Sequence, residues 1–165
     1  MEFLFDKIGF ITVALLLAVA VVFDLKFRII PNWVCGSILL LGFAMQGALN
    51  GGQGLLDGAL GMLLALGVFV PAYAAGWMGA GDAKLMAAVG TLLGPLGTLN
   101  AIIFTLFVGG AFGLFHIVAR GAVVATPWLL RFYAPDPTTS KVFFPYALAI
   151  AAGSVCAYFF SIVTF

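Results

Sequence analysis

Long apolar stretches, separated by short polar or glycine-rich segments, run through the whole chain. A helix that crosses the hydrocarbon core of a bilayer needs about 20 apolar residues, with a range of roughly 17–25. By this measure the sequence predicts six membrane-spanning helices, at 8–23, 33–49, 55–77, 83–96, 99–118 and 142–165. The turn-forming sequences NGGQG (50–54) and GPLGTLN (94–100) separate the second helix from the third and the fourth from the fifth. We therefore expect one all-α, polytopic membrane domain over residues 1–165.

Composition supports this reading. Only 8% of the residues are charged and 64% are hydrophobic, whereas soluble domains average about 25% charged residues. The net charge of +1 gives no indication of a nucleic-acid partner. Because Glu2 and Asp6 replace the basic region of a signal peptide, we expect the first helix to be retained.

The basic residues predict an orientation. Loops on the cytoplasmic side of a membrane are enriched in lysine and arginine. Only Lys7 lies on the opposite side of the membrane. The other six basic residues follow the first, third and fifth predicted helices, and they are Lys26, Arg28, Lys84, Arg120, Arg131 and Lys141. Both termini are thus predicted outside the cytoplasm. The cytoplasmic loop 120–141 is polar and contains a candidate interfacial helix at 127–133.

Two acidic side chains stand out by their position. Asp24 and Asp82 each fall at the cytoplasmic boundary of a predicted helix, on the same membrane face although far apart in sequence. The other four carboxylates have ordinary explanations as residues of outer segments or turns: Glu2, Asp6, Asp57 and Asp136. A single interfacial aspartate can serve merely as an anchor. Ionisable residues at membrane depth also mark functional sites, and two on one face favour the functional interpretation.

Peptide hydrolysis is the chemistry that uses two aspartates. When two carboxylates lie close together, repulsion prevents both from ionising, so they share one proton. The ionised carboxylate takes a proton from water, and the protonated one donates to the carbonyl oxygen. Gly79 and Gly81, just before Asp82, are expected to let a substrate backbone approach closely and to adopt backbone angles, including positive φ, that aim Asp82 inward.

Three motifs together resemble a known family. The sequence GAGDAKL (79–85) resembles the GxGDxKL signature of type IV prepilin peptidases, which belong to the GxGD class of membrane aspartyl proteases. The segment DLKFRIIPN (24–32) is similar to the first-aspartate motif of that family, and PYALAI (145–150) to its last-helix motif. The three motifs occur in order and span nearly the whole chain.

The resemblance implies an enzyme of the bacterial inner membrane whose active site faces the cytoplasm. It would cleave the basic leader of prepilins or pseudopilins after a glycine that precedes their hydrophobic helix, with Asp24 and Asp82 as catalytic residues. Pilus assembly machinery would be a further partner. Larger members carry two CxxC pairs, whereas this sequence has only Cys35 and Cys156, which we interpret as core residues. We therefore expect a short, Flp-type member without zinc or another cofactor.

Residues near the aspartates are candidates for substrate binding or support of the site. They are Gly79, Gly81, Lys84, Lys26, Pro31, Asn32, Pro145 and Tyr146. Lys84 would either hold Asp82 ionised or act as an interfacial anchor, and Lys26 is first a topology signal. Pro31 and Asn32 are expected to begin the second helix, with proline in its first turn. His116 is interpreted as a residue satisfied by neighbouring helices.

Other functions remain open at this stage. A small transporter or channel would also place acids in a membrane and interrupt a helix, although both aspartates lie at one interface and not near the midplane. A non-enzymatic pilus assembly factor would not need two intact aspartates. A GxGD protease that acts on ordinary membrane proteins would lack the segment 24–32 as it stands here.

Overall fold

The computed structural model describes residues 2–27, 29–76, 78–125 and 146–163, with side chains for 11–27, 29–76, 78–111 and 146–159. Most of these residues are helical and none of them forms a strand, which confirms the predicted all-α class. The helices are α1 (Glu2–Phe27), α2 (Asn32–Ala74), α3 (Ala80–Ala125) and α4 (Tyr146–Val163).

Helices α2 and α3 are each interrupted at one glycine. Gly51 (φ 60°, ψ −138°) and Gly94 (φ 65°, ψ −175°) have non-helical backbone angles, which favour glycine because it lacks a Cβ. They divide α2 into 32–50 and 52–74, and α3 into 80–93 and 95–125. Both breaks fall in the turn sequences predicted at 50–54 and 94–100. Near the second break, the side chain of Gln46 donates to the carbonyl oxygen of Leu92 at 2.8 Å, which satisfies one acceptor of a broken helix end.

The membrane character is visible in what the helices bury and expose. Two stretches of the described chain, Asn32–Ala74 and Ala80–Ala111, are long and apolar enough to cross a membrane. Large apolar side chains such as Leu40 (70% exposed) and Phe107 (72% exposed) lie on the surface, whereas Thr91 and Thr98 are buried. This distribution indicates a membrane protein, while six crossings stay a prediction.

Several predicted boundaries are wrong, and the first helix covers Glu2–Phe27 in place of 8–23. The fifth predicted helix ends at residue 118, but α3 continues to Ala125, so residues 120–125 are helical and do not belong to a loop. The remainder of that loop, with the candidate interfacial helix at 127–133, lies outside the described residues.

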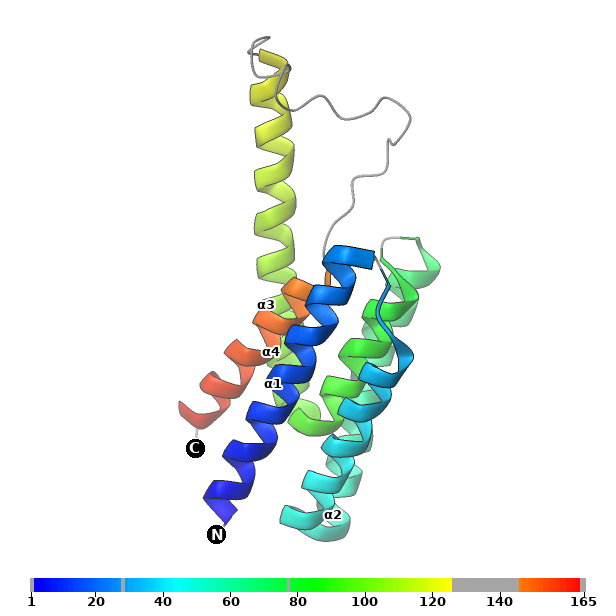
Figure 1. Ribbon diagram of the computed structural model, residues 1–165, viewed down its shortest axis with the longest axis vertical. Coiled ribbons are helices and arrows are strands. Elements are labelled where there is room, and N and C mark those ends of the chain that lie inside the picture. Colours follow the sequence, from blue (N-terminus) through cyan, green and yellow to red (C-terminus); the bar gives the residue numbers. More distant parts are fainter. Residues whose placement is uncertain (1, 28, 77, 126–145, 164–165) are drawn as a thin grey trace.

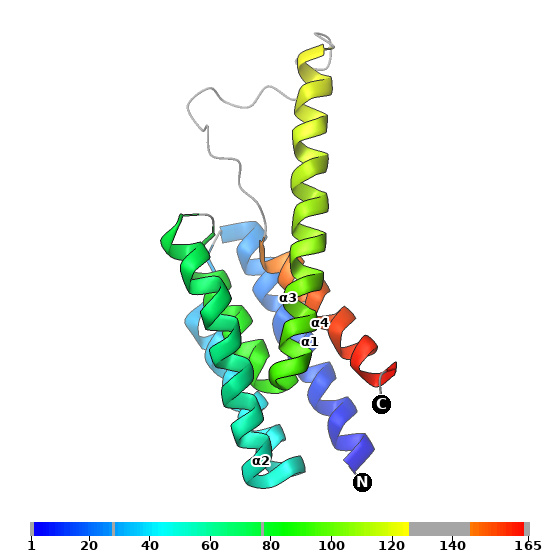
Figure 2. The same cartoon turned by 180° about the vertical axis from the view of Figure 1, so that it is seen from behind.

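Most of the helix ends lie at one end of the bundle (Figure 1). The end of α1, both ends of α2 and the starts of α3 and α4 lie there, and the two chain termini and the turn within α2 lie toward the opposite end. We call the end of the bundle where α1 ends and α3 begins the aspartate end, because Asp24 lies in the last turn of α1 and Asp82 in the first turn of α3. Seen from behind, the last part of α3 extends past this end (Figure 2).

The core is built on the first segment of α3, in which most residues from Asp82 to Thr91 are buried. A helix that is apolar on all sides is stable only when other helices enclose it. Glycines allow the close approach. A Cβ on Gly61 of α2 would overlap the carbonyl oxygen of Gly90 of α3, and a Cβ on Gly153 of α4 would overlap the hydroxyl of Thr105. Small residues at helix interfaces are typical of membrane bundles.

Candidate active site

Asp24 is a buried carboxylate held at the start of another helix. Its side chain is 6% exposed, and its carboxylate accepts a hydrogen bond from the backbone N–H of Ala147 in the first turn of α4. The first N–H groups of a helix have no partner within the helix, and their partial positive charge stabilises an anion. Asp24 Oδ2 is buried and has no hydrogen-bond partner among the described residues.

Asp82 is held in a similar way by its own helix. It is 8% exposed, and its Oδ2 accepts a hydrogen bond from the backbone N–H of Gly79 at 3.2 Å. The N–H of Asp82 in turn donates to the carbonyl oxygen of Gly79 at 3.2 Å. An acidic side chain that reaches back to the N–H before its helix forms one half of a capping box. The start of α3 therefore fixes the position of this carboxylate.

The structure places Asp24 and Asp82 at the same end of the bundle, at the end of α1 and the start of α3. Their carboxylates are near enough for the charge of Asp24 to act on Asp82, although 58 positions separate them in sequence (82 minus 24). Each carboxylate accepts one hydrogen bond from a backbone N–H at the start of a helix, which is α4 for Asp24 and α3 for Asp82. Two buried like charges repel strongly in a low-dielectric site.

The two glycines of the motif act through their missing side chains. The prediction of positive φ at Gly79 and Gly81 is wrong, because among the described residues near the site positive φ occurs at Gly76 (φ 76°). Gly76 follows the end of α2, and its N–H donates a hydrogen bond to the carbonyl oxygen of Tyr73. Glycines after helix ends often do this. A Cβ on Gly79 would lie 3.1 Å from Asp82 Oδ2, and a Cβ on Gly81 would lie 3.2 Å from Cβ of Ile30. Close approach is what these positions require.

Lys84 connects α3 to α2. Its Nζ donates to Oδ1 of Asn32 at 3.3 Å, so within the described chain its hydrogen bond goes to Asn32 and not to Asp82. Pro31, with extended angles (φ −63°, ψ 134°), directly precedes α2, and Asn32 is the first helical residue. The helix begins at Asn32 as predicted, but the prediction that Pro31 belongs to its first turn is wrong, because Pro31 lies one position before the helix with an extended backbone.

The remaining candidates lie farther from the carboxylates or outside the described residues. Lys26 is exposed, and its Nζ lies 5.4 Å from the ring centre of Phe27. Pro145 and the side chain of His116 are outside the described residues. Cys35 is buried as expected, whereas Cys156 is exposed, so its interpretation as a core residue is wrong. No three potential metal ligands cluster within the described ranges.

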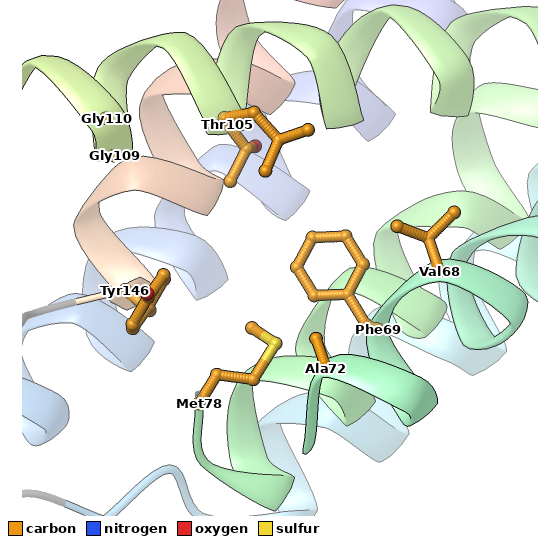
Figure 3. Close-up of a pocket in the computed structure, with 9 residues that line it drawn as sticks. Val68, Phe69, Ala72, Met78, Thr105, Gly109, Gly110 and Tyr146 are labelled. Carbon is orange, nitrogen blue, oxygen red and sulfur yellow. The ribbon is translucent and has the colours of Figure 1, made fainter. Parts of the chain in front are cut away.

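A pocket lies between α2, α3 and α4. Its volume is about 280 Å³, and the side chains of Phe69, Met78 and Tyr146 face the same space (Figure 3). Val68, Ala72 and Thr105 complete much of its wall. Sequence reasoning did not identify this pocket, nor the role of Ala147, because neither has a local signal. They arise only when helices distant in sequence pack together.

The sequence matches a known protein family. The model of the Type IV leader peptidase family matches residues 11–114, and the chain belongs to this family. It is 30% identical over 169 residues to "Prepilin leader peptidase/N-methyltransferase" of Bacillus subtilis (strain 168). That match covers 98% of this chain and 59% of the relative, so the chain spans about three fifths of the relative's length. No solved structure matches significantly.

Proposed function

We propose that this protein is a membrane aspartyl endopeptidase that removes the leader peptide of type IV prepilins or pseudopilins of the Flp-like kind. Family membership supports a leader peptidase, and the similar Bacillus subtilis protein is named for the same activity. The observation that carries the proposal is that two buried aspartates, Asp24 and Asp82, lie at the same end of the bundle, with the charge of one acting on the other.

The two carboxylates have complementary tasks in hydrolysis. The ionised one takes a proton from a water molecule as the water oxygen attacks the carbonyl carbon of the scissile peptide bond. The protonated one gives its proton to the carbonyl oxygen. As the tetrahedral intermediate collapses, the C–N bond breaks, the leaving nitrogen takes a proton from the pair, and one hydroxyl group of the intermediate returns its proton to the pair. The products are a new carboxyl group on the leader and a new amino group on the pilin, and the pair again holds one proton.

The unpaired carboxylate oxygen of Asp24 fits this scheme. Buried polar atoms are normally hydrogen-bonded, yet Asp24 Oδ2 has no partner within the described chain. A water molecule or the substrate carbonyl group would supply one during the reaction. Asp82 Oδ2 is already engaged by Gly79, so this hydrogen bond orients the second carboxylate while its other oxygen is left for chemistry. The pair titrates as a unit, and neither residue is assigned as acid or base.

The proposed location is the bacterial inner membrane, with multiple crossings and the aspartate end in the cytoplasm. Lys26 and Lys84 are exposed at that end, as expected for residues retained on the cytoplasmic side. A prepilin would present its basic leader there while its hydrophobic helix remains in the bilayer. Contacts with pilus assembly machinery would follow from the same location.

Cleavage of purified prepilins tests this function. The protein, in detergent or liposomes, is incubated with prepilins encoded beside its gene, and the products are read by mass spectrometry. We expect one cut after the glycine before the hydrophobic helix, with the same rate in EDTA because carboxylates do the chemistry. No cut in any prepilin would contradict the proposed function. Activity lost in EDTA and restored by zinc would contradict the carboxylate mechanism.

A further inference from the structure

The last turn of α1 carries Asp24 but buries little else. Residues 25–27, which follow Asp24 in this turn, are exposed. The buried apolar side chains of α1 lie one turn or more before Asp24, and they are Val13, Leu17 and Ala20. The ends of helices open more readily than their centres. The position of Asp24 therefore depends on contacts made close to the end of α1.

Phe23 makes such a contact with α2. Its ring centre lies 6.4 Å from that of Trp33, and the two ring planes meet at 88°, an edge-to-face arrangement. Pairs of this kind, with ring centres about 4.5–7 Å apart, are favourable because the positive edge of one ring meets the negative face of the other. Phe23 directly precedes Asp24 in the same helix. A contact that holds Phe23 therefore also holds the backbone of Asp24.

Trp33 belongs to a part of α2 that is tied to the helix of the other aspartate. Val34, the next residue, is buried in the core. Asn32, the residue before, accepts a hydrogen bond from Lys84 of α3 at 3.3 Å, and Lys84 follows Asp82 by two positions. The first turn of α2 thus contacts α3 on one side and, through Trp33, the end of α1 on the other. These contacts connect the backbones that carry the two aspartates.

The Trp33 ring is 57% exposed, so burial in the core does not explain its size. Tryptophan is common at membrane interfaces, but an interfacial anchor needs no aromatic partner. We propose that Trp33 is a positioning residue, which holds the last turn of α1 through Phe23 and so sets the position of Asp24 relative to Asp82. The proposal rests on the proposed function, because it assigns Trp33 a role in cleavage without contact with the substrate.

Cleavage kinetics of three variants test this role. Trp33→Leu removes the ring, Trp33→Phe keeps a ring beside Phe23, and Phe107→Leu is the control for the loss of an exposed ring, because Phe107 is 72% exposed on α3. The energy of an aromatic pair corresponds to a factor of roughly two to ten. We expect Trp33→Leu to lower kcat by this factor without a change in KM. Trp33→Phe should restore most of kcat, and Phe107→Leu should leave kcat unchanged.

Three kinetic results would overturn the proposal. The first is a wild-type kcat in Trp33→Leu. The second is a change in KM alone, which would make Trp33 a contact of the substrate. The third is an equal loss in Trp33→Phe and Trp33→Leu that occurs in liposomes but not in detergent, which would make Trp33 an interfacial anchor only.

Hydrogen exchange separates this proposal from the proposed function, because it needs no cleavage. Exchange of the backbone N–H groups is followed by mass spectrometry on the full-length protein in detergent. In Trp33→Leu, residues 24–27 should exchange roughly two- to tenfold faster than in the wild-type protein, residues 11–20 should not change, and Trp33→Phe should resemble the wild type. This result would support the hold of Trp33 on α1 even if the wild-type protein cut no prepilin. Unchanged exchange of residues 24–27 in Trp33→Leu would overturn the proposal even if the wild-type protein cut every prepilin.

Discussion

The backbone N–H of Gly79 lies 3.2 Å from Oδ2 of Asp82, and a Cβ on Gly79 would lie 3.1 Å from the same oxygen. One glycine therefore both donates to the carboxylate and leaves the space that the carboxylate occupies. The first glycine of the GxGD motif is explained by this contact. The second is explained by another, because Gly81 packs against Ile30 in the connection between α1 and α2, which links Asp82 to the segment that follows Asp24.

The variant Gly79→Ala should lower cleavage without unfolding the protein. The added methyl group would push the carboxylate of Asp82 by a few tenths of an ångström. Misplacement of a catalytic group by 1 Å can cost about 100-fold, so we expect a loss of kcat of roughly tenfold. Gly36→Ala is the control, because a Cβ there meets no atom within 4 Å. Equal kcat of the two variants in the cleavage assay would show that the contact at Gly79 does not affect catalysis.

Lys84 should act through Asn32. If its hydrogen bond to Asn32 holds α3 against α2, then Lys84→Met and Asn32→Ala should each lower kcat by about two- to fivefold, the effect of one hydrogen bond near 0.5–1 kcal/mol. The double variant should be no worse than either single variant, since both remove the same contact. A direct effect of Lys84 on the charge of Asp82 would appear differently. It would shift the pH profile of kcat in Lys84→Met but not in Asn32→Ala.

The contact between Gly61 and Gly90 should carry much of the packing of α2 on α3. Gly90→Ala places a methyl group against the backbone of Gly61, and overpacking of this kind costs about 1–3 kcal/mol. We expect a lower midpoint of thermal unfolding in detergent, by several degrees. Gly67→Ala, which meets open space, should keep or slightly raise the midpoint because alanine favours helix over glycine. A midpoint that is the same for Gly90→Ala and the wild-type protein would contradict the observed packing.

Much of this architecture follows from local sequence. Apolar length and turn-forming glycines predict the helical segments and the breaks at Gly51 and Gly94, because these signals depend only on neighbouring residues. The position of Asp82 at a helix start also follows, since the small residues before it cannot extend the preceding apolar segment.

Other features depend on distant contacts and could not be predicted. The anchor of Asp24 is a backbone N–H of α4, a group that every residue except proline has. Gly81 was expected to supply unusual backbone angles, but its position against Ile30 can be known only from the packed structure. The exposure of Cys156 is a further example, because an apolar segment in a membrane protein can face either lipid or core.

Membrane orientation can be measured independently of catalysis. The six-to-one asymmetry of basic residues predicts that Asn50 lies outside the cytoplasm and Asp136 inside. Alkaline phosphatase and green fluorescent protein fused at these two positions should therefore report opposite sides. Cytoplasmic fluorescence from the fusion at Asn50 would contradict the orientation and, with it, a cytoplasmic aspartate end.

The catalytic partnership of Asp24 and Asp82 is tested most directly by comparing two single variants with their double variant. Asp24→Asn and Asp82→Asn keep the shape of each side chain but prevent the pair from sharing a proton. Each should lower kcat/KM for prepilin cleavage by at least about 1,000-fold, within the range for loss of acid–base catalysis. All variants should retain the unfolding midpoint of the wild-type protein. Asp57→Asn is the control, because Asp57 packs near Gly94, away from the aspartate end.

Because groups that act as one unit are strongly non-additive, the double variant Asp24→Asn/Asp82→Asn should cleave prepilin no more than severalfold more slowly than either single variant. Substantial cleavage by either single variant, or losses that multiply in the double variant, would contradict a shared mechanism.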